Sequence, residues 1–284
     1  MDSAKEYLTL MREIIGEAGQ IALSQQEGIR PGLKADASVI TAADRDISVL
    51  THRKLDPYLQ TGKHLLIDEE DPHKSEYLNE KVINATPYIW AIDPVDGTRL
   101  YANHIPLYAV SLGLIRDGRP WLGMVYFPGL QELFYCDGDT SFYVRQAFTP
   151  QETATVIRPV DQDISDASLF LLSDNFFRRF SWSYENCRFF VSACAALNLC
   201  WPVIGRAAGS MDQSHLWDFS GGWPIVQSAG LQLRHLQTGK VLDRLDPAVF
   251  HQAEMPWRLK EYHLLSSPRN FEILRAKIHG LEAA

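Results

Sequence analysis

Short apolar runs that end abruptly in carboxylates are the feature that most restricts the fold of this chain. Residues 88–92 (Tyr-Ile-Trp-Ala-Ile) are followed at once by Asp93, and residues 65–67 lead into the acidic run 68–71. Runs of this length and composition are typical of buried strands. The sequence therefore predicts a buried sheet that presents acidic side chains at one edge.

Helical patterns precede this sheet, and further strands follow it. A capping-box sequence at residues 3–6 opens a helix that continues to Gly28, and a second helix is predicted over residues 41–55, ended by Pro57. We expect both helices to cover one face of the sheet. Later apolar runs predict an antiparallel meander of strands at residues 108–115, 121–127, 132–135 and 141–144.

Beyond a polar stretch at residues 148–155, strand and helix patterns alternate. This stretch is the only linker candidate in the 284 residues, so the sequence predicts two units, residues 1–150 and residues 151–284. The second unit is expected to be of alternating α/β type. Its predicted strands are residues 168–172, 231–233 and 262–266, and its predicted helices are residues 193–204, 220–229 and 268–279.

Charge and composition exclude several classes of function. The chain has 27 Lys and Arg against 35 Asp and Glu, a net charge of −8, which offers no attraction to a nucleic-acid backbone or an anionic membrane. No apolar stretch approaches the roughly 20 residues of a membrane span, and the N-terminus lacks an apolar signal core. We therefore expect a cytoplasmic protein. Without any CxxC pair, the cysteines are expected to be buried free thiols: Cys136, Cys187, Cys194 and Cys200.

The carboxylates after residue 92 point to a cation site. Asp93 ends the strand, Pro94 fixes the backbone, and Gly97 allows a sharp turn after Asp96, so both carboxylates can point into one site. Carboxylates this close repel one another unless a cation lies between them, and hard oxygen ligands suit magnesium. The alternatives for these segments taken singly are a structural Asp-Gly turn and, for Asp218, an N-cap.

Taken together, the acidic segments resemble a known family. Residues 93–98 (Asp-Pro-Val-Asp-Gly-Thr) resemble the first signature of the magnesium-dependent, lithium-sensitive phosphatases, which include inositol monophosphatases, bisphosphate nucleotidases and fructose-1,6-bisphosphatases. Residues 217–222 resemble the second signature, and residues 34–44 and 69–70 resemble the N-terminal motifs. The resemblance implies an α+β fold, a five-layer α/β/α/β/α sandwich of the inositol monophosphatase type.

The resemblance also implies a role for each matching residue. Two or three Mg²⁺ ions per site would be held by Glu69, Asp93, Asp96, Asp218 and the backbone carbonyl of Val95. The implied catalytic residues are Asp44, Thr98 and Glu69, of which Asp44 and Thr98 orient and deprotonate the attacking water. The implied phosphate and substrate contacts are Lys34, Asp96, Gly97, Thr98, Ala193, Cys194 and Ala195.

The implied activity is hydrolysis of a small phosphorylated metabolite, such as an inositol monophosphate, by metal-activated water, in a homodimeric enzyme. Three positions depart from the pattern: Met211 stands where inositol monophosphatases carry Glu, Ser220 and Gly221 replace Ala-Ala, and residues 137–142 replace a Gly- and Asn-containing loop. Two alternatives stay open. One is a 3′(2′),5′-bisphosphate nucleotidase or another sugar or polyol phosphatase of the superfamily, and the other is an inactive metal-binding regulatory homologue.

Overall fold

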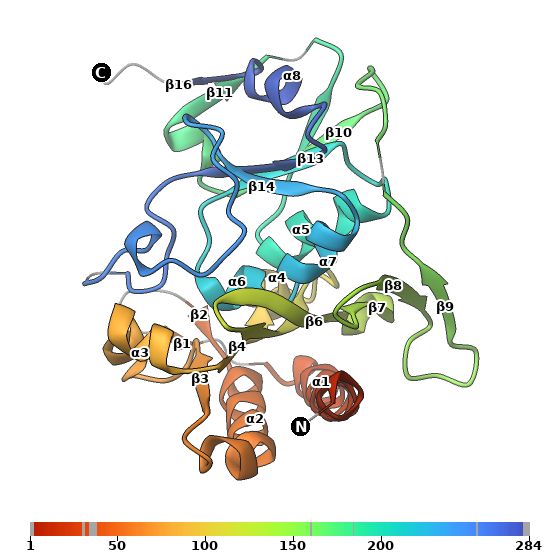
Figure 1. Cartoon of the computed structure of the whole chain (residues 1–284). Coiled ribbons are helices and arrows are strands. Elements are labelled where there is room, and N and C mark those ends of the chain that lie inside the picture. Colours follow the sequence, from red (N-terminus) through yellow and green to blue (C-terminus); the bar gives the residue numbers. More distant parts are fainter. Residues whose placement is uncertain are drawn as a thin grey trace.

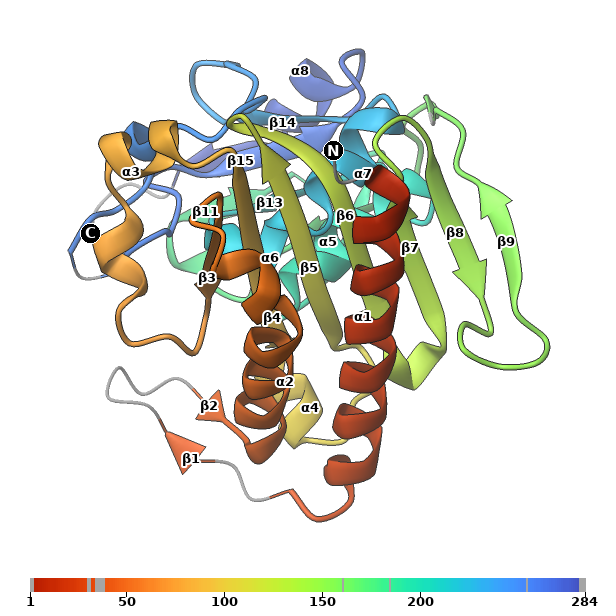
Figure 2. The same cartoon turned by 60° about the horizontal axis from the view of Figure 1, so that its bottom comes forward.

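Two long helices form the first layer of the molecule. The computed structural model describes residues 3–29, 32–33, 39–159, 161–183, 185–253 and 255–280. In it, α1 (Ala4–Gln26) and α2 (Ala42–Leu59) pack together and cover one face of a large sheet, as expected (Figures 1 and 2). The side chain of Ser3 caps α1 by accepting a hydrogen bond from the backbone N–H of Glu6 at 3.3 Å.

The predicted end of the second helix is wrong by about one turn. Pro57 lies inside α2, which continues to Leu59. A proline removes one backbone hydrogen bond and crowds the preceding turn. Because Pro57 falls in the last turn of α2, that loss affects only the end of the helix, and the chain tolerates it.

The second layer is a seven-stranded sheet with the order β3-β4-β5-β6-β7-β8-β9. β3 runs parallel to β4, and all the other neighbours are antiparallel, which confirms the predicted meander. β9 arises from the stretch predicted to be a linker and forms an exposed edge. The strands are β3 (His64–Asp68), β4 (Tyr88–Asp96), β5 (Ala109–Arg116), β6 (Arg119–Phe127), β7 (Glu132–Cys136), β8 (Ser141–Arg145) and β9 (Thr153–Val156).

The third layer consists of helices that lie between the large sheet and a second sheet (Figure 1). These are α5 (Ala195–Val203), α6 (Leu216–Ser220) and α7 (Trp223–Ser228). α6 packs on β4 and β5, and α7 packs on β6. A single hydrophobic cluster joins these helices to residues of both sheets, so the middle layer is the shared core of the molecule. The division at residue 150 stays a prediction.

The second sheet has the order β12-β10-β13-β15-β14, and α8 (Phe271–Arg275) covers its outer face. The layers thus follow one another as helix, sheet, helix, sheet, helix, and the predicted five-layer α+β sandwich is confirmed. The strands are β10 (Leu169–Leu172), β12 (Arg188–Val191), β13 (Gly209–Asp212), β14 (Gln232–His235) and β15 (His263–Ser266).

Two predicted C-terminal helices need correction. Residues 220–229 do not form one helix, because the chain breaks between α6 and α7 at two glycines. The helix predicted over residues 268–279 ends at Arg275, after which β16 (Ile278–Gly280) pairs antiparallel with β11 (Phe180–Trp182). Pairing with a distant strand overrides the local helical pattern. Short elements complete the fold: β1 (Gly32–Leu33), β2 (Val39–Ile40), α3 (Glu80–Ala85) and α4 (Thr98–Ala102).

All four cysteines are buried and unbonded, as predicted. In the part of the chain that the structure describes, no helix has both the length and the apolar character needed to cross a membrane.

Gly221 lets the middle helices touch the backbone of the large sheet. A Cβ atom at this position would lie 2.6 Å from Ser111 Oγ and 2.9 Å from the carbonyl oxygen of Met124. The neighbouring Ser220 is buried, and its hydroxyl donates to the carbonyl of Ala91 at 3.3 Å. The departure from Ala-Ala at residues 220–221 therefore concerns packing against the sheet.

We expect Gly221→Ala to lower the free energy of unfolding by about 1–3 kcal/mol, because the added methyl group has no space. Urea denaturation followed by circular dichroism measures the change. Gly28→Ala is the matched control, since a Cβ there meets nothing within 4 Å. Equal stability of the two variants would contradict this account of residue 221.

Candidate active site

A bulge at the end of β4 brings two carboxylates to one side of the sheet. Residues three apart on a regular strand point to opposite faces. Here the pairing with β5 shifts by one residue, since Asp93 pairs with Ser111 and Asp96 pairs with Ala109. The bulge contains Pro94, which has no N–H to donate to the neighbouring strand. The extra residue lets both carboxylates face the middle helices.

Gly97 makes the turn that follows. Its φ of +85° lies in the left-handed region that favours glycine, and it leads the chain directly from β4 into α4. A Cβ at this position would also approach the Cβ of Cys194 to 3.2 Å, at the start of α5. A glycine is therefore needed both for the turn and for the contact between α4 and α5.

Two more aspartates occupy equivalent places at the starts of helices. Asp44 is the third residue of α2, and its carboxylate accepts hydrogen bonds from the backbone N–H and the hydroxyl of Thr41, at 2.7 and 2.6 Å. Asp218 is the third residue of α6 and accepts from the backbone N–H of His215 at 2.8 Å. His215, not Asp218, is the N-cap residue. Carboxylates at this position satisfy N–H groups that the helix leaves free.

The acidic turn after β3 is fixed by Asp68. The buried carboxylate of Asp68 accepts from the backbone N–H of Glu70 at 2.8 Å and from the hydroxyl of Ser48, and it lies 3.2 Å from Nε2 of His52. These contacts bind the turn to α2 and leave Glu69 on the wall of a pocket.

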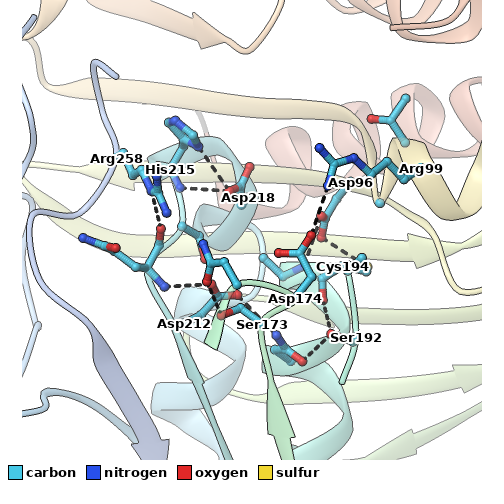
Figure 3. A pocket seen from close by; sticks show the side chains of 18 of the residues that line it. Asp96, Arg99, Ser173, Asp174, Ser192, Cys194, Asp212, His215, Asp218 and Arg258 are labelled. Atoms are coloured by element: carbon cyan, nitrogen blue, oxygen red, sulfur yellow. Dashed lines mark hydrogen bonds and ion pairs between the residues drawn. The ribbon is translucent and has the colours of Figure 1, made fainter. Parts of the chain in front are cut away.

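The pocket has a volume of about 260 Å³ and lies where β4, α4, α5 and α6 meet (Figure 3). Among the residues implied by the sequence resemblance, its lining includes Glu69, Asp96, Gly97, Thr98, Ala193, Cys194, Ala195 and Asp218. Asp44, Asp93 and Val95 do not line it and are buried. Lys34 lies outside the described residues.

Burial and mutual repulsion raise the pKa values of the carboxyl groups at this site. Burial, then the charges of Glu69, Asp96 and Asp218, hold the pKa of Asp93 well above its usual range. Burial and the charge of Asp218 raise the pKa of Asp96 to about 8, and burial chiefly raises the pKa of Asp44 to about 7. Such a cluster is unfavourable by itself and is typical of a site that a cation neutralises.

The donor set fits a hard divalent cation. Oδ1 of Asp93 is buried without a hydrogen-bond partner, and it lies near three other carboxylates. Within the described ranges, however, no three His, Cys, Asp or Glu side chains are already arranged around one point that could hold an ion. Asp96 instead accepts from the backbone N–H groups of Ala195, at 3.1 Å, and Ala196. Binding of an ion would thus require side-chain rearrangement.

The two residues expected to activate water are not hydrogen-bonded to each other in the described part of the chain. The hydroxyl of Thr98 donates to the carbonyl of Val95 at 2.9 Å, which is the carbonyl expected to bind metal. Asp44 takes its hydrogen bonds from Thr41. The charge of Glu69 nevertheless helps to raise the pKa of Asp44, so Asp44 lies close to the same acidic cluster.

The sequence interpretation missed a carboxylate on the second sheet. Met211 is buried in the outer core, whereas the next residue of β13, Asp212, lines the pocket. Asp212 accepts from Nδ2 of Asn198 at 3.2 Å and from the backbone N–H of Gln213 at 2.7 Å, and burial raises its pKa to about 6. Strand alternation puts neighbours on opposite faces, so recognising β13 would have identified Asp212. Arg258, which also lines the pocket, gave no signal in the sequence.

The sequence model of the inositol monophosphatase family matches residues 3–269. The chain belongs to this family. It is a phosphatase, a hydrolase of phosphate monoesters, as are its relatives. It is 27% identical to inositol monophosphatase 2 of Solanum lycopersicum over 237 residues, 77% of this chain and 83% of the relative. It is 28% identical to a fructose-1,6-bisphosphatase/inositol-1-monophosphatase of Aquifex aeolicus over 155 residues, 52% of this chain and 57% of the relative.

Solved structures of the inositol monophosphatase family have the same fold. A staphylococcal IMPase-I complexed with products superposes with a TM-score of 0.73 at 13% identity, covering 99% of both chains. An IMPase of Thermotoga maritima superposes with a TM-score of 0.70 at 17% identity, covering 95% of this chain and 96% of the other.

Proposed function

We propose that this chain is a magnesium-dependent phosphomonoesterase that hydrolyses a small phosphorylated polyol, sugar or similar metabolite. The observation that carries the proposal is the buried Asp93, which has an unpartnered oxygen and lies near the carboxylates of Glu69, Asp96 and Asp218. A binding site for substrate phosphate could not be this acidic without bound cations. The ligands would be Glu69, Asp93, Asp96, Asp218 and the carbonyl of Val95.

Bound Mg²⁺ supplies positive charge that offsets the repulsion between water and an anionic phosphate. The chain itself positions the reactants. Asp44, whose pKa is raised toward neutrality, accepts a proton from the attacking water, and Thr98 orients that water. The backbone N–H groups of Gly97 and Thr98, at the start of α4, hold phosphate oxygens.

The other end of the pocket suits the hydroxyl groups of an alcohol leaving group. Asp212 supplies a partly buried carboxylate there, and Asn198 and Ser173 add polar groups. Relatives named for inositol monophosphate and fructose 1,6-bisphosphate support a polyol or sugar phosphate as substrate. Although residue 211 is Met rather than Glu, the next residue, Asp212, gives this end of the pocket a carboxylate.

Phosphate release from a substrate panel tests the proposal. The panel holds inositol 1-phosphate, fructose 1,6-bisphosphate, adenosine 3′,5′-bisphosphate and histidinol phosphate, each assayed with Mg²⁺ and with chelator. We expect release from at least one ester with Mg²⁺ and none with chelator. A preference for adenosine 3′,5′-bisphosphate would favour the nucleotidase alternative. No release from any ester would favour an inactive regulatory homologue.

Two further proposals come from the family resemblance, inhibition by lithium and a homodimer, and the free cysteines support a third, a cytoplasmic location. Light scattering after size-exclusion chromatography measures the mass of the assembly directly. A monomer of 32.2 kDa would exclude the homodimer.

A further inference from the structure

Arg258 is the pocket residue that neither the sequence motifs nor the proposed chemistry uses. It belongs to the segment between β14 and β15 and lines the pocket beside His215 and Asp212 (Figure 3). Arg99 lies on the opposite side in this view. Arg258 is therefore placed on the side that would receive the leaving group, away from the turn at Gly97 and Thr98.

The guanidinium of Arg258 is held in place before any ligand binds. Its Nε donates to the carbonyl of Gln213 at 2.9 Å, and Nη1 contacts the sulfur of Met255 at 3.1 Å. Residue 258 also forms a β-bridge with His215, and the next N–H, of Leu259, donates to Ser214 at 3.0 Å. These two side-chain contacts use two of the five N–H donors of an arginine, so three are left.

Two carboxylates of the pocket lining, Asp174 and Asp212, have partners other than Arg258. Asp174 forms an ion pair with Arg99 at 3.2 Å, and Asp212 is satisfied by Asn198 and a backbone N–H. Arg258 lies within ion-pair distance of no carboxylate in the described part of the chain. A fixed guanidinium without an acidic partner is suited to bind the planar oxygens of a carboxylate or the oxygens of a phosphate.

Tyr262 lies close to Arg258, among groups of both charges. Burial raises the pKa of Tyr262. The charges of Arg179 and Arg258 act against that rise and those of Asp212 and Asp174 add to it, so all four groups lie near the tyrosine hydroxyl. That hydroxyl donates at 3.3 Å to Asn175, which lines the pocket. Arg179 is exposed and forms no ion pair with the described carboxylates.

We propose that Arg258 binds a second anionic group, a carboxylate or a phosphate, on the leaving group of the substrate. The enzyme then prefers esters whose alcohol is itself an anion. The inference rests on the proposed phosphomonoesterase function and adds the charge class of the alcohol. In the reaction, the bond between phosphorus and the alcohol oxygen breaks, a bond between phosphorus and the water oxygen forms, and the alcohol oxygen receives the proton that the water gives up, with its second anion still held by Arg258.

Three small esters of different charge test the proposal. They are 3-phosphoglycerate, with an anionic alcohol, glycerol 3-phosphate, with a neutral one, and phosphoethanolamine, with a cationic one. We expect the wild type to have the highest kcat/KM for 3-phosphoglycerate. Arg258→Gln should lower that value by about 10- to 100-fold and change the value for glycerol 3-phosphate less than threefold. Arg258→Lys keeps the charge and should be intermediate.

Fructose 1,6-bisphosphate against fructose 1-phosphate repeats the comparison at the same ester bond with a phosphate as the second anion, so the two pairs together show which anion Arg258 prefers. The control is Arg269→Gln, which removes an exposed arginine that pairs with Asp161 and Asp163 outside the pocket. It should change neither ratio. An equal loss for charged and neutral esters in Arg258→Gln, or a wild-type preference for the neutral or cationic ester, would overturn the proposal.

Binding separates failure of this inference from failure of the proposed function. If the wild type hydrolyses none of the esters, the phosphomonoesterase proposal fails. Calorimetric titration of 3-phosphoglycerate and glycerol 3-phosphate with Mg²⁺, in an Asp44→Asn background, then decides the role of Arg258. Tighter binding of 3-phosphoglycerate that Arg258→Gln removes supports it, and equal binding of the two esters contradicts it.

Discussion

Asp93→Asn should abolish phosphate hydrolysis and, in the metal-free protein, raise stability. Asp93 is fully buried, and its pKa is raised well above the usual range by burial, Glu69, Asp96 and Asp218. Asparagine has nearly the same shape without the charge. We expect activity below about 1% of wild type, because a charge that binds the cations is lost. We also expect a gain of about 1–3 kcal/mol in the free energy of unfolding without metal, because folding no longer buries a carboxyl group that ionises readily in the unfolded chain.

The direction in which the stability of the metal-free protein changes with pH provides a further check of this prediction. A carboxyl whose pKa is raised on folding binds its proton more tightly in the folded state, so stability is greatest at low pH and falls as pH rises through the folded pKa. For Asp96 that pKa is about 8, and for Asp44 about 7, so the metal-free protein should lose stability between pH 4 and 8. The loss should be smaller in Asp93→Asn.

Urea denaturation with chelator and with Mg²⁺ measures both effects. Mg²⁺ should stabilise the wild type strongly and Asp93→Asn weakly, since a ligand stabilises only the state that binds it. Asp71→Asn is the control, because it removes a carboxylate of the acidic run at residues 68–71 that does not line the pocket. A metal-free Asp93→Asn protein that is less stable than wild type, or one that keeps more than a few per cent of activity, would refute the assignment of Asp93 as a buried metal ligand.

The features that could be predicted from the sequence are those that short segments encode. The apolar run before Asp93 predicts β4, and the Pro94 and Gly97 that follow predict a turn that brings Asp93 and Asp96 to one side, although the bulge itself appears only in the pairing with β5. The meander was predictable for the same reason, since its strands follow one another along the chain. The start of α2, just before Asp44, was predictable because Thr41 is a capping residue, whereas the start of α6 was not, because its N-cap is His215.

The features that could not be predicted depend on contacts between distant segments. β13 lies between β10 and β15, and only this pairing decides that Met211 is buried while Asp212 faces the pocket. β16 forms because β11 is available to pair with it, although its residues have a helical pattern. Arg258 reaches the pocket through a bridge to His215, more than 40 residues earlier in the chain. Local patterns carry no information about such partners.

Thr98→Ala and Asp44→Asn should each lower kcat by about 10²- to 10⁴-fold while KM changes little. Asp44 is buried, with a pKa raised to about 7, and Thr98 lines the pocket with its hydroxyl on the carbonyl of Val95. Removing either group affects the attacking water rather than the bound ester. Thr98→Ser keeps the hydroxyl and should stay within about tenfold of wild type.

The double variant decides whether the two residues act on one water molecule. They share no hydrogen bond in the described part of the chain, so any coupling between them has to pass through a bound molecule. If both act on the same water, adding Thr98→Ala to Asp44→Asn should lower kcat by less than a further tenfold or so. The effects of groups that act as a unit are not additive. Steady-state kinetics of the four proteins gives the coupling. Fully additive losses, or an effect of Thr98→Ala on KM alone, would separate the two residues and leave Asp44 without its proposed partner.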